Sequence, residues 1–366
     1  MEYIKIKDIL EFKKKSKIKA SEGLKIGKYN FYTSSKEQNK FLDYYEYSNE
    51  ALIIGTGGNA NIHHSYGKFS VSTDCFVLEN KGNKIFLVEY IYKYLLKNIH
   101  ILESGFRGAG LKHISKEYLE NIEIPIISLE KQKKLIKNLK NIDIFIEKNK
   151  QIKDELNFLN KSLFTTMFGD IKTNDKNWEI LEIKEVSNIL TRGKTPKYTS
   201  LSNIFVINQA CIYWDRIKYE NIKFHLEEEN LLFLKNKDIL INSTGTGTLG
   251  RMNIIKNIIN EKFTIDSHVM LLRLKKEKVL PVYFINIFMR EKYQEELILK
   301  CVNGSTNQIE LSKERFSRFK IPVPPIELQN KFAERVEKIE KLSFEIENSI
   351  KEAENLYNSL MNKYFE

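Results

Sequence analysis

Few residue patterns in this chain of 366 residues could carry catalysis. The glycine-rich run at residues 55–59 (GTGGN) follows an apolar run and could cradle a phosphate, but no Gly-Lys-Ser/Thr follows it. His63 and His64 are adjacent, which is poor spacing for two metal ligands, and a surface turn is the alternative. No Gly-x-Ser-x-Gly nucleophile motif is present. We therefore expect no catalytic residue and no metal site.

The sequence also lacks the motif for methyl transfer to a DNA base. An amino-methyltransferase holds the flipped base with Asp or Asn, two prolines and an aromatic residue. The pair Pro324-Pro325 has no preceding Asp or Asn, and Ile326 follows it. The sequence therefore predicts a protein that recognises a ligand and is not an enzyme.

The charge of the chain indicates a polyanionic partner. The net charge is +11, with +4 in residues 1–127 and +6 in residues 169–325. Lys and Arg side chains that neutralise phosphates release counterions, which supplies most non-specific affinity for nucleic acid. A Lys-, Ile- and Asn-rich codon bias is the alternative explanation. Charge alone does not choose between DNA, RNA and a membrane surface.

The cysteines and the apolar segments indicate the compartment. Cys75, Cys211 and Cys301 are far apart and odd in number, so the sequence suggests no disulfide framework. The N-terminus lacks the apolar region of a signal peptide, and no segment is long enough to span a bilayer. We expect a cytoplasmic protein with no membrane partner.

An internal repeat organises the chain. Pro125 aligns with Pro322, an offset of 197 positions that persists for about forty residues. Apolar positions coincide while surface residues differ, and the same register extends upstream of both prolines. Two copies of one unit predict a two-fold pseudosymmetry.

Each copy ends in a long amphipathic helix, predicted at residues 128–168 and 326–366. Apolar residues recur there in steps of three and four, neither stretch contains Gly or Pro, and each helix would be roughly 60 Å long. The first stretch has a net charge of +4 and the second of −3, which favours pairing with each other. Asn149 lies in the apolar stripe, where it could fix the register or lie at a solvated edge. An ordinary pair of core helices is the alternative.

The globular parts are predicted at residues 1–127 and 169–325. Short apolar runs flanked by turn residues predict strands at residues 51–54, 75–78, 204–207, 238–241 and 268–272. Helical periodicity appears at residues 86–96 and 282–299. We therefore expect a mixed α/β fold, with twisted mixed sheets in two domains that two long antiparallel helices join as a coiled coil.

These features together resemble a known family. The repeats that begin near Ile-Pro, the Glu-x-Gln at both helix starts (Glu130 to Gln132 and Glu327 to Gln329) and the turn-rich segments before them resemble specificity subunits of type I restriction-modification enzymes. The resemblance spans essentially the whole chain. The segments that carry it further are 19–24, 27–35, 51–60, 67–70, 73–74, 192–198, 206–209, 238–245, 250–251 and 265–268.

The resemblance implies two target-recognition domains, each reading one half of a split double-stranded DNA site. It further implies that the paired helices set the gap and carry two modification (methyltransferase) subunits, which a restriction subunit can join. S-adenosylmethionine and ATP would then belong to partner subunits, with no cofactor in this chain. Two other readings remain open: the specificity subunit of a combined nuclease-methyltransferase system, and a basic coiled-coil scaffold that binds nucleic acid without sequence preference.

The expected DNA contacts are polar and basic residues in glycine-rich turns, because a missing Cβ lets the backbone approach the duplex. Arg, Asn and Gln can read base edges, whereas Lys, Ser and Thr more often bind phosphates. Plain turn chemistry is the alternative for the Gly, Ser and Thr members. The candidates are Thr33, Ser34, Ser35, Lys36, Thr56, Asn59, Asn61, His63, Arg107 and Lys112 in the first part, and Arg192, Lys194, Lys197, Tyr198, Asn208, Gln209, Thr244, Thr246, Arg251, Thr306, Asn307 and Gln308 in the second.

Overall fold

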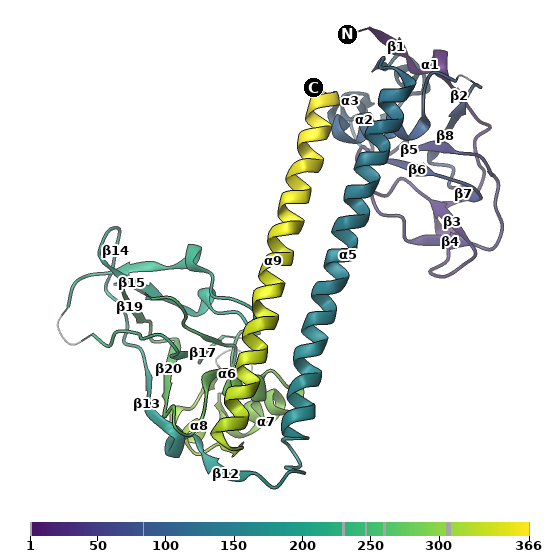
Figure 1. Ribbon diagram of the computed structural model, residues 1–366. Coiled ribbons are helices and arrows are strands. Elements are labelled where there is room, and N and C mark those ends of the chain that lie inside the picture. The colour runs from purple at the N-terminus through teal and green to yellow at the C-terminus, as the bar shows by residue number, and fades with distance from the viewer. Residues whose placement is uncertain are drawn as a thin grey trace. The chain divides into compact units, whose positions relative to one another are not determined.

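The computed structural model describes residues 2–82, 84–228, 231–245, 247–258, 261–304 and 309–365. The chain divides into two compact units: unit 1 contains Met1–Gln151 and Ile346–Glu366, and unit 2 contains Ile152–Glu345. The helices α5 (Leu129–Phe168) and α9 (Ile326–Phe365) each contribute to both units (Figure 1). Unit 1 holds the start of α5 and the end of α9, and unit 2 holds the other halves.

Unit 1 is built from two sheets, a short strand pair, a hairpin and short helices. The four-stranded sheet is antiparallel throughout, in the order β2-β8-β5-β6, and the three-stranded sheet β4-β3-β7 contains one parallel pair, β3 with β7. Its elements are β1 (Tyr3–Lys5), α1 (Ile6–Ile9), β2 (Leu10–Phe12), η1 (Ala20–Glu22), β3 (Tyr29–Tyr32), β4 (Lys40–Leu42), β5 (Ala51–Gly55), β6 (Ile62–Ser65), β7 (Phe69–Val71), β8 (Cys75–Asn80), α2 (Val88–Lys97), α3 (Ile99–Glu103), β9 (Phe106–Arg107), β10 (His113–Ile114), α4 (Lys116–Glu120) and β11 (Glu123–Pro125).

Unit 2 repeats this plan. Its sheet β13-β20-β17-β18 is antiparallel, its sheet β14-β16-β15-β19 contains the parallel pair β15 with β19, and β12 pairs with β23 as β1 pairs with β11. Its elements are β12 (Glu179–Glu182), η2 (Ile183–Val186), β13 (Ser187–Arg192), β14 (Tyr198–Thr199), β15 (Ile204–Ile207), η3 (Gln209–Cys211), η4 (Tyr219–Asn221), β16 (Lys223–His225), β17 (Ile239–Asn242), β18 (Met252–Ile254), β19 (Lys262–Ile265), β20 (Val269–Leu274), α6 (Pro281–Phe288), α7 (Glu291–Cys301), β21 (Val302–Asn303), β22 (Glu310–Leu311), α8 (Lys313–Ser317) and β23 (Lys320–Val323).

The mixed α/β fold and the two long helices are confirmed. All five predicted strands are present, as β5, β8, β15, β17 and β20, with bounds shifted by at most two residues. The predicted helix at 86–96 is α2. These segments were predictable because each is a buried apolar run that ends at turn residues, which is a local signal.

The helical segment predicted at residues 282–299 is also present, but it is divided into the two helices α6 and α7. Arg290 interrupts the helical path with extended backbone angles, φ −86° and ψ 126°. Its guanidinium lies 4.7 Å from the Phe164 ring centre, and its Nη2 donates a 3.0 Å hydrogen bond to the Lys161 carbonyl on α5. These contacts with α5 accompany the break, and helical periodicity within the segment could not reveal them.

The Glu-x-Gln motif has a structural role in both units. Gln132 and Gln329 are fully buried at the starts of α5 and α9. Gln329 Oε1 accepts a 2.9 Å hydrogen bond from the Leu280 amide, and its Nε2 donates to the carbonyls of Lys278 and Pro324 at 2.9 and 2.8 Å. Gln132 makes the corresponding three bonds to Leu87, Ile85 and Ile127. Each glutamine therefore ties the start of a long helix to the segment that precedes α2 or α6.

Replacing Gln329 with leucine should destabilise unit 2 with little change in volume. The substitution leaves a buried amide and two carbonyls without this partner, and each such group costs about 1–3 kcal/mol. We expect a clear decrease in the free energy of unfolding, measured by denaturant titration. Gln151→Leu, on the exposed surface of α5, is the matched control and should leave stability nearly unchanged. Equal stability of the two variants would contradict the role assigned to Gln329.

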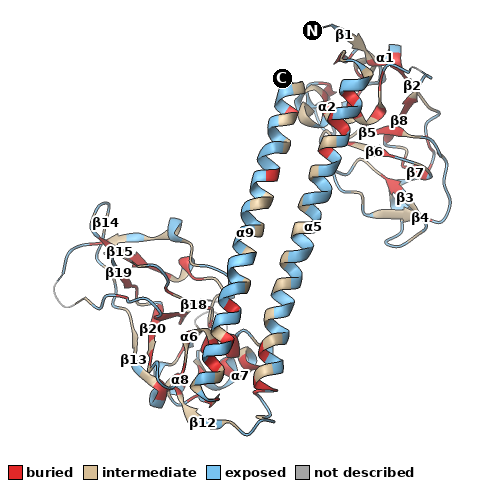
Figure 2. Ribbon diagram, viewed as in Figure 1, coloured by how far each residue is buried: buried red, intermediate tan, exposed pale blue. Residues whose placement is uncertain are grey.

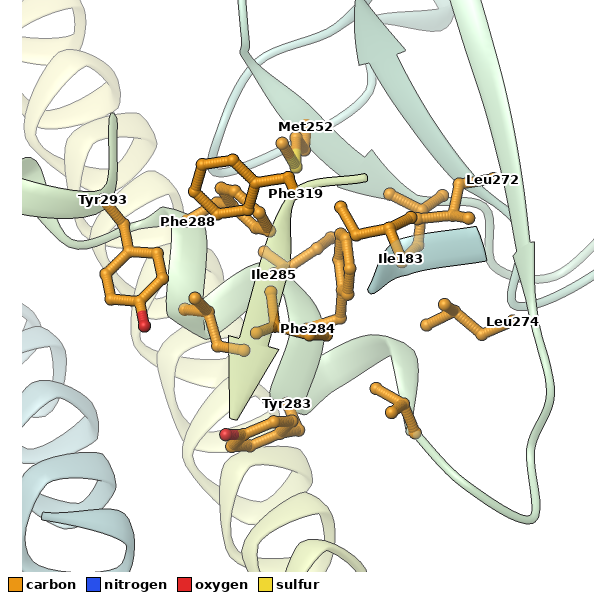
Figure 3. Packing of buried hydrophobic residues seen from close by; sticks show 14 of the residues in the cluster. Ile183, Met252, Leu272, Leu274, Tyr283, Phe284, Ile285, Phe288, Tyr293 and Phe319 are labelled. Atoms are coloured by element: carbon orange, nitrogen blue, oxygen red, sulfur yellow. The ribbon is translucent and has the colours of Figure 1, made fainter. Parts of the chain in front are cut away.

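Each unit has its own apolar core. In unit 2, α6 packs against the strands of the antiparallel sheet and against β23, and Figure 3 shows Phe288 beside Phe319 and Met252. The rings of Phe288 and Phe319 lie 5.6 Å apart. In unit 1, Leu52, Ile54 and Leu78 pack against α2 and the start of α5. The strands that end at the candidate residues are therefore anchored in well-packed cores.

The two long helices are buried only in part. Leu135 and Leu139 on α5 belong to the unit 1 core, and Phe332 and Val336 on α9 belong to the unit 2 core. Away from the cores, most residues of α5 and α9 are exposed or half-buried (Figure 2). Asn149 is half-buried, and its amide donates a 2.8 Å hydrogen bond to the Phe145 carbonyl of its own helix. Among the described residues, no helix is long and apolar enough to cross a membrane.

Candidate nucleic-acid interface

In unit 1, the turn after β5 is held by backbone contacts to two other segments. The Asp74 carbonyl accepts hydrogen bonds from the Thr56 amide and hydroxyl, at 2.8 and 3.0 Å. The Ile114 amide donates to the Thr56 carbonyl at 3.1 Å, and the Gly58 amide donates to the Lys112 carbonyl at 3.2 Å. These contacts hold the β9–β10 hairpin against the turn. Gly58 has φ +82°, a conformation that glycine adopts without strain.

The loop after β3 joins the same end of the sheet. Ser34 Oγ donates a third hydrogen bond to the Asp74 carbonyl, at 2.6 Å. His63 Nε2 lies 2.8 Å from the Ser35 carbonyl, so this nitrogen carries the proton and donates. Burial lowers the pKa of His63, and the hydrogen bond to Ser35 raises it less. The imidazole is therefore neutral at pH 7, where it can donate a hydrogen bond but brings no charge.

All ten candidates of unit 1 lie on segments at this end of the sheet, but they differ in exposure. Thr56 and Asn61 are buried, at 6% and 5% exposure, and they support the turn. The Asn61 amide donates to the Asn59 carbonyl at 3.0 Å. Thr33, Ser34 and His63 are half-buried. The exposed candidates, which we call the first candidate surface, are Ser35, Lys36, Asn59, Arg107 and Lys112.

Unit 2 repeats the same backbone contacts with different residues. The His268 carbonyl accepts from the amide and the hydroxyl of Ser243, both at 2.9 Å. The Leu311 amide donates to the Ser243 carbonyl at 2.8 Å, as Ile114 does to Thr56. Ser243 and His268 therefore occupy the positions that Thr56 and Asp74 hold in unit 1, and the β21–β22 hairpin corresponds to β9–β10.

The polar candidates around this turn are partly used by the fold. Asn208 is 8% exposed, and its side chain accepts from the Ala210 amide and donates to the Asn221 carbonyl, both at 2.8 Å. Thr244 Oγ1 donates to Gln209 Oε1 at 3.1 Å and lies 3.0 Å from His268 Nδ1. Thr244 and Gln209 are half-buried, so they still reach the surface, whereas Asn208 supports the loop.

Three of the basic candidates of unit 2 already contact other groups. Arg192 Nη2 donates to the Leu311 carbonyl at 2.6 Å, and the guanidinium pairs with Glu310. Lys197 pairs with Glu228. The Arg251 guanidinium lies 5.2 Å from the Tyr213 ring centre, where cation and ring attract each other.

We define the second candidate surface by the unit 2 candidates that reach solvent. Lys194, Lys197 and Tyr198 are exposed, and the other members are half-buried. The members are Arg192, Lys194, Lys197, Tyr198, Gln209, Thr244 and Arg251. Thr246, Thr306, Asn307 and Gln308 lie outside the described residues.

Sequence reasoning missed several residues at these surfaces. Asp74 and His268 lie in segments that carry the family resemblance, but they were not candidates because their main contribution is a backbone carbonyl. Lys223 lies with its ammonium 4.7 Å from the Tyr198 ring centre, and Lys218 lies 4.4 Å from that of Tyr213. Basic residues that alternate with aromatic ones between 213 and 223 were the available signal. Within the described ranges, no group of three or more His, Cys, Asp or Glu could hold a metal ion.

Known proteins share this organisation. Residues 1–157 and 175–354 match the model of the Type I restriction modification DNA specificity domain. The chain is 28% identical over 315 residues to the Type I restriction enzyme MjaVIII specificity subunit of Methanocaldococcus jannaschii, covering 80% of this chain and 73% of that protein. It is 27% identical over 222 residues to the putative type I specificity subunit S.MpnORF507P of Mycoplasma pneumoniae, covering 54% and 59%.

Solved structures share the fold. The S subunit of a type I restriction-modification system from M. genitalium has a TM-score of 0.67 at 14% identity, covering 100% of this chain and 96% of that chain. A chain from a study of complex assembly and conformational transition in the type I R-M system has a TM-score of 0.53 at 12% identity, covering 100% and 97%. Because the family model matches most of the chain and the fold occurs twice, this chain belongs to the family of type I restriction modification DNA specificity domains and carries two of them.

Proposed function

We propose that this chain selects the DNA site of a type I restriction-modification system and that each unit reads one half of a bipartite site. The recognition domains would be residues 1–127 and 169–325, with spacer helices at 128–168 and 326–366. One observation carries the proposal: the same backbone contacts present a turn and a hairpin in both units, with different side chains facing outward. Equivalent platforms with unlike side chains suit two unlike half-sites.

The chemistry of both surfaces supports DNA as the ligand. Among the described residues, no ion pair engages Lys36, Arg107 or Lys112, so these cations are available to phosphates or base edges. Arg251 and Lys223 lie beside tyrosine rings, which limits how many rotamers their long side chains adopt. Ordered cations cost less entropy to bind, which favours sequence reading over loose attraction.

Competition between duplexes tests the proposal. The protein, with its methyltransferase partner, should bind a duplex that carries the genomic methylation site at least about 10³-fold more tightly than a random duplex of equal length. Equal competition by all duplexes would instead indicate a non-specific nucleic-acid scaffold. A combined nuclease-methyltransferase system would bind DNA in the same way, but its co-purified partner would be one chain with both activities.

The exposed apolar residues of the long helices support docking of two methyltransferase subunits. In unit 1, Phe145 on α5 and Leu356 on α9 are 46% and 53% exposed and line the same groove. The repeat offset places Leu342 and Leu159 at the equivalent positions of unit 2, where both are 49% exposed. Exposed apolar patches commonly mark protein interfaces, and two equivalent patches fit two copies of one partner. Those partners would bind S-adenosylmethionine, and restriction subunits would bring ATP-dependent cleavage.

Single charges on these patches should remove the partners one at a time. We expect two methyltransferase chains per copy of this chain, because the exposed pair occurs twice. Phe145→Asp and Leu342→Asp should each give a complex with one methyltransferase chain, and the double variant should bind none, as native mass spectrometry would show. Leu201→Asp, at a position 82% exposed outside the helices, is the control. A one-to-one complex of the unaltered protein at saturating partner would contradict the stoichiometry.

A further inference from the structure

A half-buried lysine, Lys93, joins α2 to both long helices within unit 1. Lys93 Nζ donates a 2.8 Å hydrogen bond to Tyr357 Oη on α9 and lies 3.4 Å from Asp143 Oδ2 on α5. The Lys93 side chain is 12% exposed, whereas that of Asp143 is 53% exposed, so the hydrogen bond to Tyr357 is the shielded part of the contact. The Lys93 ammonium also lies 5.2 Å from the Tyr357 ring centre and 6.0 Å from that of Tyr92. One side chain therefore contacts all three helices.

The ammonium keeps its charge in this position. Burial alone would lower the pKa of Lys93, but the hydrogen bond to Tyr357 and the charge of Asp143 raise it above the ordinary value. An ammonium shielded from water in this way needs an acceptor, so loss of the Tyr357 hydroxyl would leave a donor without its hydrogen bond. The contact is therefore directional in a way that apolar packing is not.

The neighbouring residue Tyr92 connects α2 to β6, the strand that leads to the first candidate surface. The Tyr92 ring stacks on the His64 ring of β6 at 5.6 Å and 27°. His64 Nε2 lies 2.8 Å from Glu50 Oε1. The preceding residue on β6 is His63, which contacts the loop that carries Ser35 and Lys36. The helix α2 is thus fixed between β6 and the two long helices.

The repeat identifies the equivalent residues in unit 2. Tyr90 donates to the Pro125 carbonyl at 3.0 Å as Tyr283 donates to that of Pro322 at 2.8 Å, so position 93 in α2 corresponds to 286 in α6. The helix offset of 197 pairs Asp143 with Glu340 and Tyr357 with Asn160. Lys93, Asp143 and Tyr357 of unit 1 therefore correspond to Asn286, Glu340 and Asn160 of unit 2.

These three residues make no equivalent contact. The Asn286 amide donates to the Val282 carbonyl of its own helix at 2.9 Å. Glu340 pairs instead with Lys256 at 2.6 Å, and both side chains are about half exposed, at 52% and 48%. Asn160 Oδ1 is buried with no hydrogen-bond partner among the described residues. All three line a cavity of about 290 Å³. Unit 2 therefore has a cavity where unit 1 has the hydrogen bond between Lys93 and Tyr357.

Both units have one equivalent aromatic contact beside this position. Phe365 on α9 lies 5.4 Å from the Tyr90 ring, and Phe168 on α5 lies 4.7 Å from the Tyr283 ring. The apolar surroundings differ as well, since Phe164 and Phe332 of unit 2 correspond to Met361 and Leu135 of unit 1. An exposed lysine-glutamate pair contributes little and is weakened by salt, so it cannot replace the buried contact.

We propose that Lys93 is a positioning residue, which fixes the first recognition domain on the helix pair and thereby sharpens the choice of gap length in the DNA site. The second domain lacks this contact and is joined to α5 instead through the hydrogen bond of Arg290 to the Lys161 carbonyl. The proposal rests on the proposed function, because gap length has meaning only for a bipartite site.

The proposal is tested by measuring affinity for three duplexes. Their gaps have the preferred length, one base pair more and one base pair less. Lys93→Met should reduce the discrimination against the wrong gaps about threefold to tenfold, the range expected for one hydrogen bond. Affinity for a duplex with only the first half-site should stay unchanged. Tyr357→Phe, which removes only the hydroxyl, gives a milder version if Lys93→Met folds poorly. Lys93→Arg, which keeps the charge, should retain most of the discrimination.

Unit 2 offers both a control and a converse experiment. Lys256→Met removes the exposed pair with Glu340 and should leave gap discrimination unchanged. Asn286→Lys combined with Asn160→Tyr rebuilds the unit 1 contact and should narrow the tolerated gaps.

Unchanged discrimination in folded Lys93→Met and Tyr357→Phe, or a parallel loss of half-site affinity, would overturn the proposal. If the unaltered protein preferred no gap at all, the proposed function would fail first.

Discussion

Replacing Arg251 with alanine should weaken recognition of one half of the DNA site and leave the other half unaffected. The Arg251 backbone belongs to the second platform, since its carbonyl accepts a 2.8 Å hydrogen bond from the Asn242 amide. Its guanidinium is oriented by the Tyr213 ring. A bidentate arginine contact to a base is worth about 1–3 kcal/mol, which corresponds to about 5- to 150-fold in affinity.

Arg107→Ala is the matched variant in unit 1. Arg107 is exposed on the hairpin that packs against the Thr56 turn, and it should affect only the other half-site. The measurement is affinity for duplexes in which every base pair of each half-site is changed in turn. A loss at both half-sites from either single substitution would contradict independent recognition.

The salt dependence separates the two kinds of contact that these arginines can make. If Arg251 reads a base, the alanine variant loses affinity only for sites with the correct base at one position. If it binds a phosphate, all sequences weaken alike and the slope of log K against log salt falls by about one.

Arg192→Ala should give a less clear result. Its guanidinium also bonds the Leu311 carbonyl and pairs with Glu310 on the β21–β22 hairpin. Removing it changes the hairpin as well as the DNA contact, so Arg251 is the better reporter. Glu310 also competes with DNA for Arg192, which should make the measured contribution of this arginine smaller.

Local patterns predicted the elements of this fold well, because the apolar periodicity of a strand or helix can be recognised within a few residues. The long helices begin within one residue of the predicted positions, since Ile-Pro segments precede both. The order of strands was beyond reach because pairing is set by contacts between distant segments. The pairing of β2 with β8, for example, joins Leu10 to Asn80.

The candidate surfaces were predicted in outline but not in detail. Glycine-rich turns indicated the correct ends of both sheets, because glycine is needed where the backbone turns sharply. The same composition did not distinguish Asn59, which is exposed, from Asn61, which the turn buries. Exposure depends on tertiary packing, so a residue type in a turn cannot reveal it. The role of Lys93 could not be predicted from the sequence for a related reason, because its partners lie 50 and 264 positions away along the chain.

Lengthening both long helices by four residues should lengthen the gap between the two half-sites. Each helix is one continuous element of 40 residues that contributes to both units. Four residues add about 6 Å of helix and roughly preserve the apolar stripe, because they nearly complete one turn. At about 3.4 Å per base pair, the preferred gap should increase by one or two base pairs.

The insertion sites are opposite each other in the antiparallel pair. In unit 1, Ile142 and Phe145 line a groove with Ser349 and Ala353, so the register places Asn149 opposite Ile346. Insertions after Asn149 and after Ile346 therefore extend both helices at the same level. A single insertion in one helix should shift the register instead, and it should destabilise the protein without giving a new gap.

Mapping of methylated sites by sequencing measures the outcome, in cells that contain the variant and its methyltransferase. Neither half-site sequence should change, because both candidate surfaces lie far along the chain from the insertions. The Lys93 contact lies on the unit 1 core side of Asn149, so it should persist and keep the new gap as narrowly defined as the old one. An unchanged gap in a folded and active double-insertion variant would show that helix length does not set the spacing.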